Sequence, residues 1–124
     1  MKRNELRACL RLYPKIREAI ERGDREIELI QNERKKKLEL RPWVQKLPDI
    51  IMEILAGEEN EVIRVMIEQS ILKGRKSYEI VRALPLSERT YYRWKAKFEE
   101  KVYELLILTG EVSREEILEE GIDS

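Results

Sequence analysis

Two helix signals separated by a very short turn constrain the fold of this 124-residue chain more than any other feature. Ser77 can cap a short helix that carries Leu84, and Pro85 breaks that helix. Ser87 can cap a second, longer helix that reaches Thr109. Two helices joined by so few residues cannot lie end to end, so the sequence predicts that they cross as in a helix-turn-helix.

The second helix of this pair predicts one apolar face and one basic face. An α-helix turns by about 100° per residue. One face of this helix therefore carries the apolar side chains Tyr91, Trp94, Phe98, Val102 and Leu105 as a single stripe. The opposite side presents two arginines, a tyrosine and an alanine. Arginine suits bidentate contact with guanine, and alanine allows close approach to a thymine methyl group. If this helix enters the major groove of DNA, we expect base contacts from Arg89, Tyr92, Arg93 and Ala96.

Basic and hydroxyl side chains around that helix predict contacts with the DNA backbone. Lysine and arginine neutralise phosphate charge, and serine and threonine hydroxyls bond to phosphate oxygens. The expected phosphate-contacting residues are Lys73, Arg75, Lys76, Arg82, Ser87, Thr90, Lys95 and Lys97. In a chain with 40% charged residues, however, a basic helix face is often merely solvated.

The distribution of charge favours the same region, although the net charge is zero. Residues 73–101 carry 9 basic and 4 acidic side chains, and residues 1–41 carry 13 basic and 8 acidic ones. Residues 42–72 and 102–124 are acidic. The overall charge therefore says nothing about nucleic acid, but the predicted helix pair lies within one of two basic blocks.

The sequence predicts an all-α fold, in which an N-terminal long helix or helical hairpin precedes a compact helical domain with a C-terminal helix-turn-helix. Pro14 suits a first helical turn. Gly23-Asp24 is either tolerated within one helix over residues 14–40, which we favour, or forms the corner of a helical hairpin. No strand alternation is evident. Arg34-Lys35-Lys36-Lys37 would then lie at a helix C-terminus, where cations are favoured.

The remaining segments complete this division of the chain. Pro48 starts a helix that Gly57 ends, and the apolar helix that follows, with residues 62–72, is the expected centre of the core. Ser113 and Glu116 form a possible capping box for one more short helix. We divide the chain into a helical region for oligomerisation or partner contact (1–57), a DNA-binding domain (58–110) and an acidic tail (111–124).

Several function classes find no support in the sequence. It contains no histidine, no phosphate-binding glycine loop and no cysteine pair for zinc, so we expect no catalysis, cofactor or metal. Cys9 is interpreted as a small apolar filler. No apolar run approaches the roughly 20 residues that span a bilayer, and the charged N-terminus lacks the apolar core of a signal peptide. We therefore expect a cytoplasmic protein without membrane contact.

Residues Glu79-Ile80-Val81, Leu84, Leu86-Ser87 and Thr90-Tyr91-Tyr92-Arg93-Trp94 resemble the helix-turn-helix in region 4 of bacterial sigma factors. They resemble more closely the phage late-gene regulators of the ArpU/RinA type, over about residues 59–106. This resemblance implies a phage or prophage transcriptional regulator whose recognition helix is capped by Ser87. It also implies that residues 89, 92 and 93 face DNA. Pro85 stands where glycine is usual, so the turn must be built differently.

Three functions stay open at this point. In a transcriptional regulator, the N-terminal helix would form a homodimer or contact RNA polymerase. A DNA-packaging adaptor of the small-terminase type also combines a helix-turn-helix with oligomerisation helices, although there the DNA-binding part usually comes first. A helical protein-interaction module without DNA binding becomes preferred if the face around Arg89 and Arg93 is buried against the N-terminal helix.

Overall fold

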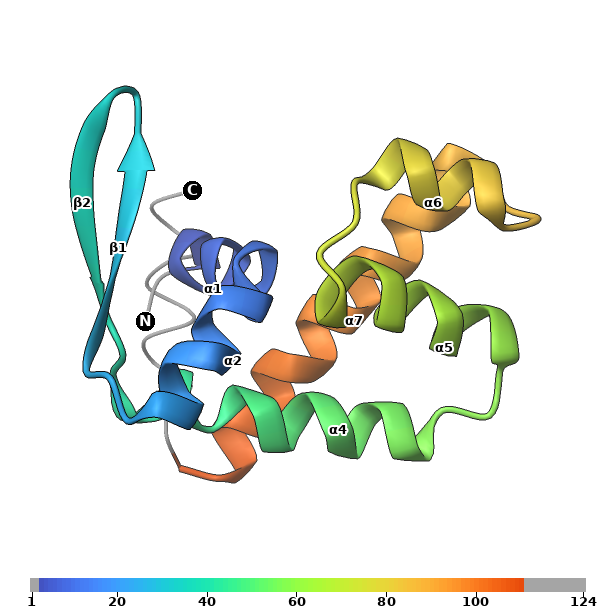
Figure 1. Ribbon diagram of the computed structural model, residues 1–124. Helices are drawn as coiled ribbons and strands as arrows, with labels where there is room; N and C mark the ends of the chain where they lie inside the picture. The colour runs from blue at the N-terminus through green and yellow to red at the C-terminus, as the bar shows by residue number, and fades with distance from the viewer. Residues whose placement is uncertain (1–2, 111–124) are drawn as a thin grey trace.

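The computed structural model describes residues 3–110, and this part of the chain is mostly helical (Figure 1). The elements in chain order are α1 (Arg3–Arg11), α2 (Tyr13–Arg22), β1 (Glu26–Gln31), β2 (Arg34–Glu39), α3 (Pro42–Gln45), α4 (Leu47–Gly57), α5 (Glu61–Ile67), the π-helical turn η1 (Glu68–Leu72), α6 (Ser77–Ala83) and α7 (Glu88–Leu108). The mainly helical character expected from the sequence is confirmed. The expected capping box at Ser113 and Glu116 and the acidic tail lie outside the described residues.

Pro14 and Gly23 mark the two ends of α2. Pro14 lies in the first turn of α2, where its missing N–H and fixed φ cost nothing. Gly23 ends the helix with a φ of 77°, and its N–H donates to the Ile20 carbonyl at 3.0 Å. This left-handed conformation is one that glycine adopts without penalty, so Gly23 is a helix stop.

The expectation of one helix over residues 14–40 is wrong, and so is the alternative of a helical hairpin. After Gly23 the chain forms an antiparallel β-hairpin, with Ile27 opposite Leu38 and Ile30 opposite Lys35. Residues Asn32 and Glu33, with φ values of 52° and 62°, form its two-residue turn, which matches the right-handed twist of the strands. The hairpin extends from the helical body like an arm (Figure 1).

The basic run Arg34–Lys37 consequently does not lie at a helix C-terminus. It forms most of β2, and all four side chains are exposed. Lys37 Nζ lies 3.4 Å from Glu26 Oε1 on the neighbouring strand. The helix dipole therefore does not account for these cations, and they remain a charged surface of the arm.

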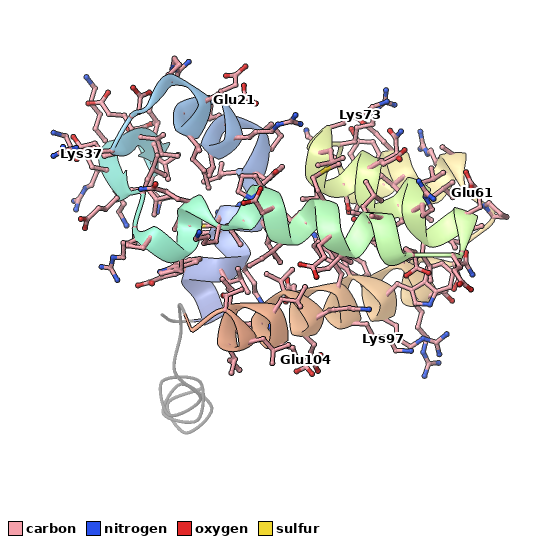
Figure 2. All side chains as sticks on the ribbon, turned by 90° about the horizontal axis from the view of Figure 1, so that it is seen from below. Glu21, Lys37, Glu61, Lys73, Lys97 and Glu104 are labelled. Carbon is pink, nitrogen blue, oxygen red and sulfur yellow. The ribbon has the colours of Figure 1, made fainter. Side chains whose placement is uncertain are left out.

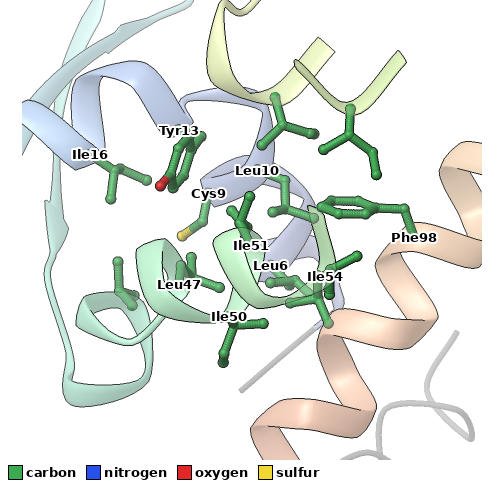
Figure 3. Close-up of a cluster of buried hydrophobic side chains, with 14 of the residues drawn as sticks. Leu6, Cys9, Leu10, Tyr13, Ile16, Leu47, Ile50, Ile51, Ile54 and Phe98 are labelled. Atoms are coloured by element: carbon green, nitrogen blue, oxygen red, sulfur yellow. The ribbon is translucent and has the colours of Figure 1, made fainter. Parts of the chain in front are cut away.

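One continuous hydrophobic core joins the N-terminal helices to the rest of the chain (Figure 3). The buried side chains on α1 and α2 pack against α4 and against Phe98 of α7. The labelled members of this cluster are Leu6, Cys9, Leu10, Tyr13, Ile16, Leu47, Ile50, Ile51, Ile54 and Phe98. The apolar stripe of the N-terminal region thus packs within the chain.

The expected central helix is divided into α5 and η1. The Asn60 side chain caps α5 by accepting hydrogen bonds from the backbone N–H groups of Val62 (2.9 Å) and Ile63 (3.2 Å). Met66, Ile67 and Ile71 are buried, but the earlier apolar residues of α5 are only half-buried.

Within residues 3–110, no helix has both the length and the apolar character needed to cross a membrane.

Candidate nucleic-acid interface

The turn between α6 and α7 is built around Pro85. The Leu86 N–H donates to the Leu84 carbonyl at 2.8 Å, which closes a three-residue turn with proline at its centre. Proline fixes φ near −65°, which suits the inverse γ-turn. No residue of this turn has a positive φ. The turn therefore reverses the chain without the left-handed residue that a glycine would supply.

The two serine caps expected on either side of this turn have different outcomes. Ser87 caps α7, because its Oγ accepts a hydrogen bond from the Thr90 N–H at 3.2 Å and donates to Thr90 Oγ1 at 2.8 Å. The prediction that Ser77 caps α6 is wrong. Lys76 occupies the N-cap position of α6 and no side-chain cap forms there. Ser77 instead lies within the first turn of α6, and its Oγ accepts a hydrogen bond from the Tyr92 hydroxyl.

The apolar stripe predicted on α7 is confirmed. Tyr91, Phe98 and Val102 are buried, and Trp94 and Leu105 are half-buried against the core. The stripe also includes Tyr103 and Leu106, which are buried as well. Because this face holds α7 in the core, the aromatic side chains at 91 and 98 are core residues rather than platforms for bases.

The opposite face of α7 is exposed where base contacts are expected. The side chains at all four positions are accessible to solvent: Arg89, Tyr92, Arg93 and Ala96. Tyr92 is 48% exposed, and its hydroxyl donates to Ser77 Oγ at 3.2 Å. Its ring also meets the Tyr91 ring edge-on, with centroids 5.2 Å apart. Tyr92 is therefore held in place between α6 and α7, while Arg89 and Arg93 are exposed to solvent.

A basic hollow of about 730 Å³ lies beside this face and collects three of the expected phosphate-binding residues. Arg75 and Lys76 line it from the segment before α6, and Lys95 lines it from α7. The Lys95 Nζ lies 6.0 Å from the centroid of the Tyr91 ring. Arg7 and Arg11 of α1 line the same hollow. We call this the α1–α7 hollow.

The other expected phosphate-binding residues are dispersed. Arg82 lies on α6 with its guanidinium carbon 5.9 Å from the centroid of the exposed Tyr78 ring. Lys73 and Lys97 point from opposite sides of the molecule (Figure 2). Lys97 borders a separate small hollow between α4, α5 and α7. Ser87 and Thr90 bond to each other, so their hydroxyls serve first to start α7.

Sequence reasoning missed Arg7 and Arg11. These arginines lie about 65 residues before Arg75, and no spacing pattern connects the two segments. Two contacts bring them together. Arg7 Nε donates to Glu99 Oε2 on α7 at 3.2 Å, and Gly74 packs so closely on α2 that a Cβ there would lie 3.2 Å from Pro14 Cγ.

Burial shifts the pKa values of ionisable groups in the core. Burial raises the pKa of the Cys9 thiol to about 12, with a smaller contribution from Glu5. Burial also raises the pKa of the Tyr91 phenol. Both groups are therefore neutral at pH 7. Among the residues that the structure describes, no group of three or more histidine, cysteine or acidic side chains could hold a metal ion.

Comparisons with known proteins provide no relative. No protein-family model, curated protein or solved structure matches the chain.

Proposed function

We propose that this protein binds double-stranded DNA sequence-specifically and regulates transcription, as a regulator of phage or prophage type. In this proposal α6 and α7 form the helix-turn-helix, and α7 enters the major groove from about Ser87. Arg89, Tyr92, Arg93 and Ala96 read base edges. Arg75, Lys76 and Lys95 hold backbone phosphates at one side of the groove.

The observation that carries the proposal is the division of α7 into two faces. One face is fixed in the core through Tyr91, Phe98 and Val102, while Arg89 and Arg93 on the other face are exposed. A recognition helix needs both properties, because its base-contacting side chains must reach the groove from a rigid support. The alternative without DNA binding would be preferred if this arginine face were buried against the N-terminal helix, but both arginines are exposed.

Fluorescence anisotropy with labelled duplex DNA tests this function. Each neutralised phosphate contributes about −0.9 to the slope of log K against log salt concentration, so titrations at two salt concentrations count the phosphate contacts. The proposal expects binding at low salt that weakens steeply with added salt. Absence of binding at low salt would refute it.

Light scattering distinguishes the regulator from a DNA-packaging adaptor. A monomer or dimer supports the regulator, whereas a closed ring of many subunits supports packaging. The apolar side chains of α1 and α2 already pack within the chain, so a dimer must use other surfaces. We propose that the exposed surface of these helices or of the β-hairpin makes the contact with a second copy or with RNA polymerase.

A further inference from the structure

A second basic hollow, which the proposed recognition face does not use, lies between the first two helices and the β-hairpin. It has a volume of about 340 Å³ and is lined by Arg11, Leu12 and Lys15 on one side. Lys35 of β2 and residues 28–30 of β1 form the other side. We call this the hairpin hollow. Arg11 lines both this hollow and the α1–α7 hollow, so the two adjoin at that side chain.

Charge is strongly biased along the combined surface. Seven different cations line the two hollows, counting Arg11 once, against the two carboxylates Glu28 and Glu99. Glu99 is already paired with Arg7, at 3.2 Å. A concave surface lined by one sign of charge focuses the electrostatic field and attracts ions of opposite sign. The surface therefore favours an anion.

The spread of the cations indicates an extended anion rather than a small one. They come from α1, α2, β2, α7 and the segment that precedes α6. Because the cations are spread over five parts of the chain, no single phosphate or carboxylate can touch them all. Duplex DNA carries one charge for about every 1.7 Å of its axis and can meet such a row of cations along its length. Lys36 and Lys37, also exposed, continue the charge along the arm.

Two contacts fix the backbone segments that carry this surface. The close approach of Gly74 to Pro14 positions Arg75 and Lys76 beside α1 and α2. The ion pair between Arg7 and Glu99 joins α1 to α7. The backbone segments that carry the cations are therefore fixed relative to one another before binding, and this lowers the cost of ordering the surface.

We propose that the two hollows form one basic track that holds the sugar-phosphate backbone of the DNA duplex, on the hairpin side of the sequence that α7 reads. The cations that form the track are Arg11, Lys15, Lys35, Arg75, Lys76 and Lys95. Tyr92 and Lys95 border the α1–α7 hollow, and Tyr92 also belongs to the recognition face, so track and face are continuous. This inference rests on the proposed function, and it adds the β-hairpin arm as a second DNA-binding element.

The test removes three cations around the hairpin hollow in one variant, Arg11→Gln with Lys15→Gln and Lys35→Gln. A matched control, Arg17→Gln with Arg22→Gln and Lys46→Gln, removes three exposed cations that border neither hollow. Wild type and both variants are titrated by anisotropy against one 24-bp duplex, selected on the wild-type protein from random DNA, and against a 12-bp duplex that keeps only the selected core. Circular dichroism checks that both variants fold.

On the 24-bp duplex, we expect the track variant to lower the magnitude of the salt slope by about 3, with the control close to wild type. On the 12-bp duplex, we expect all three proteins to bind alike. Equal slopes for track variant and wild type on the longer duplex overturn the track and leave the proposed function standing. An equally large decrease of the salt slope in the control variant also overturns the track. Failure of the wild-type protein to bind any duplex overturns the proposed function itself.

The same proteins are also titrated with a single-stranded 24-mer RNA. Both the track and the recognition face are expected to favour the duplex. Tighter binding of wild type to the single strand, lost in the track variant, would assign the track to RNA and overturn the duplex assignment.

Discussion

Substitution of Gly74 tests how the basic segment before α6 is positioned. Gly74 has a φ of 64°, and an added Cβ would lie 3.2 Å from Pro14 Cγ. The left-handed conformation costs a non-glycine residue about 1–2 kcal/mol, and alanine recovers about 0.4–1 kcal/mol by restricting the unfolded chain. The crowded contact with a rigid proline ring adds about 1 kcal/mol. We therefore expect Gly74→Ala to lower the free energy of unfolding by about 2 kcal/mol.

Substitutions at two other glycines separate the cost of the left-handed backbone from the cost of the contact with Pro14. Gly23 has a φ of 77°, but an added Cβ there would meet nothing within 4 Å, so Gly23→Ala should cost only about 1 kcal/mol. Gly57→Ala has neither penalty and should leave stability unchanged or slightly raised. Urea denaturation followed by circular dichroism measures all three. Equal losses for the variants at 74 and 23 would refute the close contact with Pro14.

Three further predictions concern the helix cap and the core. Ser87→Ala should lower the free energy of unfolding by about 1 kcal/mol in urea denaturation, while Ser77→Ala, which removes no cap, should cost less. Ile51→Ala should cost about 2–5 kcal/mol by the same measurement, because its side chain is fully buried. Cys9 should resist iodoacetamide at pH 8 until urea unfolds the chain. Because its pKa rises from 9.0 to about 12 on folding, stability should fall as the pH rises above 9, whereas Cys9→Ala should reduce that fall.

The sequence was most informative where strong local signals and burial agree. Ser87 starts α7, Gly110 follows its end with a φ of 78°, and the stripe through Tyr91 and Phe98 is buried as expected. Each of these features depends on neighbouring residues, through capping, a positive φ or the helical repeat. Such features can be read from one short window of sequence.

The β-hairpin was missed because its signals are weak and mixed. Ile27 and Ile30 have a spacing of three, which suits a helix, but Ile27 and Leu29 alternate as in a strand. Lysines have a low intrinsic preference for strands, and the turn uses Asn32-Glu33 rather than the familiar Asn-Gly pair. The stop at Gly23 followed by this alternation was the available signal.

The candidate interface could be predicted only in part, for a related reason. The residues on α7 follow from the helical repeat, so their shared exposure was predictable. The joining of Arg7 and Arg11 to Arg75 depends on contacts between segments far apart in the chain, and local sequence patterns carry no record of them. The same limit applies to the separation of Lys73 from Lys97 on opposite sides of the molecule (Figure 2).

The central claim is that the outer face of α7 reads DNA sequence, and one comparison tests it most directly. Duplexes are selected from random DNA on the wild-type protein, and affinity for the selected and for a scrambled duplex is then measured by anisotropy. The test variant is Arg89→Ala with Arg93→Ala. The control, Lys46→Ala with Lys101→Ala, also removes two exposed positive charges, away from the proposed recognition face.

A base-reading arginine contributes about 1–3 kcal/mol of discrimination, or roughly 5- to 150-fold in affinity. We therefore expect the test variant to lose at least this preference for the selected duplex, while it still binds the scrambled one through the phosphate contacts. The control should keep the wild-type preference. If the variant with both arginines replaced discriminates as well as wild type does, α7 does not read DNA through this face.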